Sequence, residues 1–148
     1  MTSPAARFAA AYAALTASHE LADYWVQVDA DAQAKGKPGR EGRLACARHV
    51  ASYTATQAAA LWAVDRYLRL GLRPGPAVTG LAVSAITHYA ADRSAGHWRD
   101  EQPTTLLPRL AHRLGKSGWT RNDPTAGPLL DQSWHKAWIT IAAGIAAA

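Results

Sequence analysis

Apolar residues recur along most of the chain at the three- and four-residue spacing of helices that bury one face. In residues 43–70, Leu44, Val50, Leu61 and Leu68 all belong to one such stripe. The same spacing predicts four further helices, over residues 5–34, 77–93, 103–114 and 129–147. We therefore expect an all-α fold, a single-domain bundle of four to five helices.

Glycine and proline residues separate the predicted helices. Residues 36–42 and 71–76 are rich in both and end the first two helices. Residues 94–102 are polar and predict a short irregular link. The longest stretch without helical periodicity is residues 115–128, directly before the last helix. We expect a long loop there, and loops of this length are often lids or binding loops.

Composition supports this interpretation. The 148 residues are enough for one domain with its own core. Hydrophobic residues make up 49% of the chain, and alanine dominates them, which favours helices over strands. The single cysteine, Cys46, excludes an intramolecular disulfide framework, and we expect it to be buried as a small apolar residue.

Apolar runs are too short for a membrane-spanning helix, which needs about 18 consecutive apolar residues. The first residues also lack the pattern of a secretory signal. We therefore expect a cytoplasmic protein with no stable membrane span. A weaker interpretation is peripheral attachment to a membrane through the apolar residues 137–148.

The chain is basic, with a formal net charge of +5 from 16 lysine and arginine residues against 11 aspartate and glutamate residues. Most of the basic residues lie in two regions, residues 35–48 and 109–121. This balance permits a phosphate-bearing small molecule or a nucleic acid as partner without identifying either. It leaves the oligomeric state open.

Histidine and aspartate residues occur three times at a spacing of four. The pairs are His19 with Asp23, His88 with Asp92, and Asp131 with His135. Residues four apart lie on the same face of a helix, so each pair would present an imidazole beside a carboxylate. One such pair carries little information, but three pairs on separate predicted helices indicate a common site.

Imidazole nitrogens and carboxylate oxygens both bind zinc and similar divalent ions. Helical bundles build metal sites from inward-facing side chains on different helices. We therefore predict that the six paired residues are metal ligands, for zinc first and for manganese or magnesium as alternatives. A metal-free catalytic or polar network is the competing interpretation, followed by coincidence.

Further side chains are candidates for catalysis and substrate binding. His49 is a further metal ligand or a proton-transfer residue, and Gln27 and Tyr53 lie at matching four-residue spacing. The candidate substrate-binding residues are Lys116, Arg121, Gln132 and Trp134. Each has an ordinary alternative: a helix-surface amide, a packed aromatic ring or a solvated charge.

The order of these residues resembles a bacterial and phage family, domain-of-unknown-function family 3307. The shared features are the H-x-x-x-D-x-x-x-Q run from His19, a downstream lysine, His49 with Tyr53, His88 with Asp92, and the D-Q-x-x-H run that ends at His135. The likeness covers about residues 15–140 and implies an arrangement of residues rather than an activity. Many members look like multi-helix inner-membrane proteins, whereas this chain has polar loops and weaker apolar runs.

More distantly, the pattern is similar to membrane-bound metal-dependent hydrolases and to all-helical zinc phospholipases and nucleases, a likeness of architecture. We therefore expect a divalent-metal-dependent hydrolase of a phosphoester, in which Lys116 and Arg121 meet substrate charge. The alternative is a non-enzymatic helical module that binds nucleic acid or protein and has a structural His/Asp network. The metal hypothesis requires the paired residues to lie within a few ångströms of one another.

Overall fold

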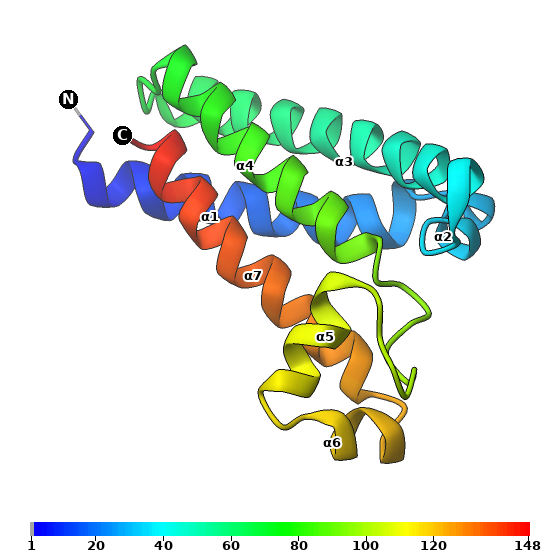
Figure 1. Ribbon diagram of the computed structural model, residues 1–148. Helices are drawn as coiled ribbons and strands as arrows, with labels where there is room; N and C mark the ends of the chain where they lie inside the picture. Colours follow the sequence, from blue (N-terminus) through cyan, green and yellow to red (C-terminus); the bar gives the residue numbers. More distant parts are fainter. Residues whose placement is uncertain (1) are drawn as a thin grey trace.

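The computed structural model describes residues 2–148, which fold into helices joined by short connections (Figure 1). Four long helices form the body of the fold: α1 (Pro4–Leu21), α3 (Gly39–Leu68), α4 (Pro74–Asp92) and α7 (Ala126–Ala146). The part of the chain that the structure describes contains no β-strand. The all-α prediction is confirmed.

The four long helices pack as two crossed pairs. Helix α1 lies along α3 and α4 lies along α7, while α1 also contacts α7 and α3 also contacts α4 (Figure 1). The buried apolar cluster joins α1, α3 and α7 and consists of Ala11, Leu15, Leu61, Ile139, Ala142, Ala143 and Ala146. Because alanine supplies most of this cluster, the helix backbones can approach closely.

Close approach is most evident between α4 and α7, at Gly80. A Cβ atom at this position would lie 2.5 Å from the carbonyl oxygen of Ala142 and 3.0 Å from the Cβ of Ala146. Glycine therefore sets the spacing of two helices that each carry a predicted His/Asp pair.

Short helices complete the fold. They are a π-helical turn, η1 (Ala22–Val26), and the helices α2 (Asp29–Ala34), α5 (Leu106–Arg113) and α6 (Ser117–Asn122). The helix expected over residues 5–34 is thus divided into three, because Gln27 and Val28 have extended backbones between η1 and α2. Helix α2 then pairs with α3 through Asp31 and Arg48.

The long loop expected at residues 115–128 is wrong. Helix α6 lies within it, and α7 begins at Ala126, so only a tight turn separates the two. Asp123 makes this turn, since its carboxylate accepts hydrogen bonds from the Thr125 backbone and from the Trp119 indole. The other predicted helices are present with ends shifted by a few residues.

Membrane insertion was not expected. Within residues 2–148, no helix has both the length and the apolar composition required to cross a bilayer.

Cys46 is buried, as expected, in α3. Burial, reinforced by the negative charge of Asp92, raises the pKa of its thiol to about 12. The thiolate is the reactive form. We therefore expect no reaction of the native protein with Ellman's reagent at pH 8, and release of one equivalent after denaturation. Rapid modification of the native protein would contradict this assignment.

Candidate metal centre

The three predicted His/Asp pairs meet at one place between the long helices. The C-terminal end of α1 supplies His19, η1 supplies Asp23, α4 supplies His88 with Asp92, α7 supplies Asp131 with His135, and α3 adds His49. All four histidines are at most 3% exposed. The structure therefore brings together residues that the sequence places on separate helices.

Four atoms form the tightest part of this cluster. Nε2 of His49 lies 2.9 Å from Nε2 of His88, and 3.3 Å from both Asp23 Oδ1 and Asp92 Oδ2. Nε2 of His88 lies 3.5 Å and 3.4 Å from the same two oxygens. Ligand atoms at ordinary zinc distances in a tetrahedral site are about 3.3 Å apart. The four atoms have that spacing.

The carboxylate oxygens in this set have no other use. Asp23 Oδ1 and Asp92 Oδ2 are buried, and neither has a hydrogen-bond partner in the described part of the chain. Leaving a buried carboxylate oxygen unpaired is costly. A cation between these oxygens and the two imidazoles would satisfy all four atoms.

The protonation states suit a cation. Burial is the main cause that lowers the pKa of His88 and of His19, so both favour the neutral form that binds metals. Burial alone would raise the pKa of Asp92, but hydrogen bonding to His88 and the charge of Lys35 outweigh it, and the pKa is lowered. Neutral imidazoles thus lie beside ionised carboxylates.

Packing orients the central imidazoles. The ring of Tyr53 stacks on that of His88 with centroids 3.9 Å apart, and its hydroxyl is 2.8 Å from Ser84 Oγ. Nδ1 of His49 and Nδ1 of His88 have no hydrogen-bond partner among residues 2–148, so ring contacts must hold the orientation. Burial also raises the pKa of Tyr53. This tyrosine, predicted as catalytic, therefore lies where it positions His88.

A second group of ligand atoms adjoins the first. Nε2 of His135 lies 3.3 Å from Asp131 Oδ2, and Nε2 of His19 lies 3.2 Å from Gln132 Oε1. Burial acts to lower the pKa of His135, but Asp131 outweighs burial and the pKa is raised. One ligand atom each from His19, His88 and His135 lie within 4.8 Å of one another.

Lys35 is a site residue that the sequence interpretation missed. Its Nζ donates to Asp92 Oδ1 at 2.9 Å and to Gln27 Oε1 at 3.4 Å, which also places Gln27 at the edge of the site. The only signal in the sequence was the downstream lysine of the family pattern, because Lys35 itself lies within a basic stretch typical of a solvated surface.

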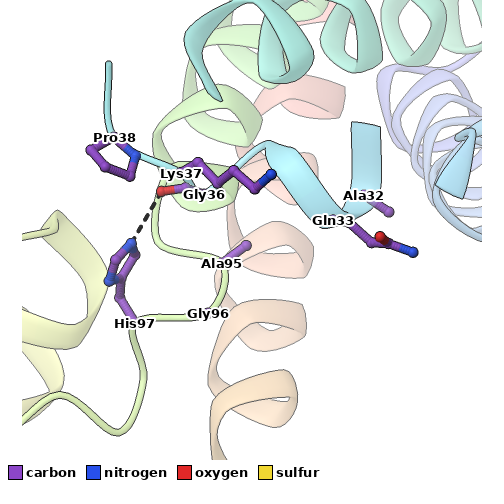
Figure 2. A pocket seen from close by; sticks show the side chains of 8 residues that line it. All are labelled: Ala32, Gln33, Gly36, Lys37, Pro38, Ala95, Gly96 and His97. Atoms are coloured by element: carbon purple, nitrogen blue, oxygen red, sulfur yellow. Dashed lines mark hydrogen bonds between the residues drawn. The ribbon is translucent and has the colours of Figure 1, made fainter. Parts of the chain in front are cut away.

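The loop that follows α2 holds Lys35 in place. The Arg93 guanidinium donates to the carbonyl oxygens of Lys35 and Lys37. Figure 2 shows His97 reaching the same loop, where its Nε2 donates to the carbonyl oxygen of Gly36 at 3.1 Å. A Cβ at Gly36 would lie 1.9 Å from a carbonyl oxygen of the facing loop, so this approach requires glycine.

The hollow in Figure 2, of about 430 Å³, is bordered by these two loops and contains none of the clustered His/Asp side chains. A different cleft, of about 300 Å³, reaches the cluster. Its lining residues are Tyr24, Lys35, Asp92, Ala95, Gly96, Trp98, Pro128, Asp131 and Gln132. The cluster is therefore open to solvent on the side of Asp92 and Asp131.

Of the four predicted substrate-binding residues, only Gln132 lines this cleft. Lys116 and Trp134 border a separate hollow of about 270 Å³ between α5 and α7. Arg121 is exposed and donates from Nε to the carbonyl oxygen of Ser117. The structure does not bring these three residues to the cleft, because α6 directs its basic side chain outward.

The chain was compared with family models, curated proteins and solved structures, and none of them matches it. The resemblance to family 3307 stays a prediction. What can be said about function comes from the geometry of the centre.

Proposed function

We propose that the protein is a divalent-metal-dependent hydrolase, with a metal ion held by His49, His88, Asp23 and Asp92. The observation that carries this proposal is the set of five separations between these four atoms, which run from 2.9 to 3.5 Å. A polar network without a metal leaves two buried carboxylate oxygens unpaired. Zinc suits a mixed nitrogen and oxygen donor set of this kind.

A bound divalent ion would lower the pKa of a water molecule and polarise an ester oxygen. Hydrolysis joins the water oxygen to the electrophilic atom, breaks the ester bond and transfers a proton to the departing oxygen. The cleft supports catalysis over a purely structural metal, because it reaches Asp92 and Asp131 from solvent. Structural zinc sites are closed.

A phosphoester is the substrate class that fits this cleft best. Lys35 lines the cleft beside Asp92, so a cation and a metal ion would both face an anionic substrate. The Gln132 amide adds a polar contact in the same lining. A volume of about 300 Å³ accommodates a phosphate group with a small substituent.

Replacing Lys35 with methionine tests its contribution. The variant keeps the length of the side chain but removes the ammonium group that contacts Asp92. We expect a loss of phosphoesterase efficiency (kcat/KM) of about 10- to 100-fold, in the range of one lost charge-assisted contact. The metal content should be unchanged. Equal efficiency in K35M and wild type would remove Lys35 from the substrate site.

Metal analysis tests the proposal as a whole. Protein purified without chelator is analysed by inductively coupled plasma mass spectrometry, and cleavage of a panel of phosphomonoesters and phosphodiesters is measured before and after chelation. His49→Ala should lose the ion and the activity. His112→Ala, which changes a histidine of α5 outside the cluster, should keep both.

Absence of bound metal, together with an unfolding temperature that no divalent ion raises, would refute the proposal. A tightly bound ion with no hydrolysis across the panel would favour the non-enzymatic helical module instead.

A further inference from the structure

The two oxygens of Asp23 face different imidazoles. Oδ1 lies 3.3 Å from Nε2 of His49 and 3.5 Å from Nε2 of His88, whereas Oδ2 lies 3.7 Å from Nε2 of His19. A carboxylate that serves two separate groups of nitrogens is suited to bridge two ions. Bridged ions in hydrolytic sites are about 3.5–4 Å apart.

His135 supplies the independent observation. Its imidazole is 3% exposed, yet Nε2 has no hydrogen-bond partner among the described residues. The nearest carboxylate oxygen, Asp131 Oδ2, lies 3.3 Å away, and one ligand atom of His19 is within 4.8 Å. A buried, unpaired imidazole nitrogen thus points to the same space as a carboxylate and a second imidazole.

These atoms cannot all bind the ion assigned above. The separations between His49, His88, Asp23 Oδ1 and Asp92 Oδ2 already complete a tetrahedral set. His19 and His135 stand outside that set, with ring centroids 5.0 Å from each other. They therefore require a second position.

The second position is also the one nearer to solvent. Asp131 and Gln132 line the cleft, whereas His49 and His88 are almost fully buried. The Gln132 amide oxygen, 3.2 Å from Nε2 of His19, is a further oxygen donor at this position. Three carboxylates face the combined centre, and Lys35 is the cation paired with one of them.

We propose that the centre holds two divalent ions bridged by Asp23: an inner ion on His49, His88 and Asp92, and an outer ion on His19, His135 and Asp131 that faces the cleft. This inference rests on the proposed function, because it places the substrate on the outer ion. Two ions can contact both the attacking and the departing oxygen of a phosphoester, and Lys35 lies on the same side.

Cobalt(II) is the probe for this proposal. The metal-free protein is titrated with Co²⁺ and followed by calorimetry, by visible absorption and by electron paramagnetic resonance. We expect two equivalents in the wild type, with a magnetic signal weakened by coupling between the ions. His135→Ala should bind one equivalent and give an uncoupled signal.

Asp131→Asn serves as a second variant, because Asp131 is partly exposed and its replacement is less disruptive to the core. It should lower the affinity of one equivalent at least tenfold and leave the other unchanged. Circular dichroism establishes that both variants are folded. His112→Ala should retain two equivalents.

The outcomes separate the two proposals. One equivalent in the wild type, kept in both variants, overturns the outer position and leaves the inner ion and the proposed function intact. Two equivalents that survive both substitutions also overturn it, because the outer ligands would be wrong. Failure of the wild type to bind any Co²⁺ overturns both proposals.

Discussion

Zinc at one hundred times its dissociation constant is expected to stabilise the native protein by about 2.7 kcal/mol for each ion bound only to the folded state. For a chain of this size, that change raises the unfolding temperature by about 5–11 °C per ion. The reason is that the ligands come from α1, η1, α3, α4 and α7 and are adjacent only in the folded bundle. Differential scanning calorimetry at increasing zinc concentration measures the shift.

His88→Ala should abolish the part of this shift that comes from the inner ion, since His88 contacts His49, Asp23 and Asp92. His88→Gln distinguishes the lost ligand from the cavity left beneath Tyr53, because glutamine fills part of that space. His112→Ala provides the matched control and should show the wild-type shift. A zinc-dependent shift that persists in His88→Ala would exclude the assigned ligands.

Gly80→Ala and Gly144→Ala are expected to change stability in opposite directions, although both add one methyl group to a long helix. At Gly80 the new Cβ would meet the backbone of α7, 2.5 Å from a carbonyl oxygen. The two helices must separate, at a cost of about 1–3 kcal/mol. At Gly144 nothing lies within 4 Å, so the higher helix propensity of alanine should add about 0.5–1 kcal/mol.

The same pair of variants connects packing with the centre. Displacement of α4 from α7 would separate His88 from His135, so Gly80→Ala should also weaken metal binding, whereas Gly144→Ala should leave it unchanged. Urea unfolding and calorimetric titration with zinc measure the two effects. Equal stability of both variants would show that α4 and α7 do not meet as described.

The His/Asp pairs were predictable because each is a local pattern. The four-residue spacing of His88 and Asp92 places both on one face of α4, whatever the rest of the chain does. The apolar residues before them indicate that this face is turned toward other helices. Local spacing and the direction of burial together led to most of the ligands.

His49 and Lys35 show where such reasoning ends. His49 has no acidic partner on its own helix, and its contacts with Asp23 and Asp92 depend on how α3 packs against η1 and α4. Lys35 meets Asp92 only because α2 turns away from the axis of α1. These are contacts between distant segments, and no local pattern encodes them.

The break in the first expected helix has the same origin. No glycine or proline separates Leu21 from Ala34, so propensity predicts continuous helix. Tertiary contacts override propensity here, because Asp31 pairs with Arg48 after the turn. The error at residues 115–128 was the reverse, since a stretch rich in glycine and polar residues still formed the short helix α6.

The strapped loop around Gly36 also affects how fast an ion can exchange. Lys35 covers Asp92, Arg93 and His97 hold that loop by its carbonyl oxygens, and the inner imidazoles are almost without contact to solvent. An inner ion could leave only when the loop detaches, so its residence time would follow the rate of local opening rather than its affinity. The metal found in the protein would then reflect which ion was present while the chain folded.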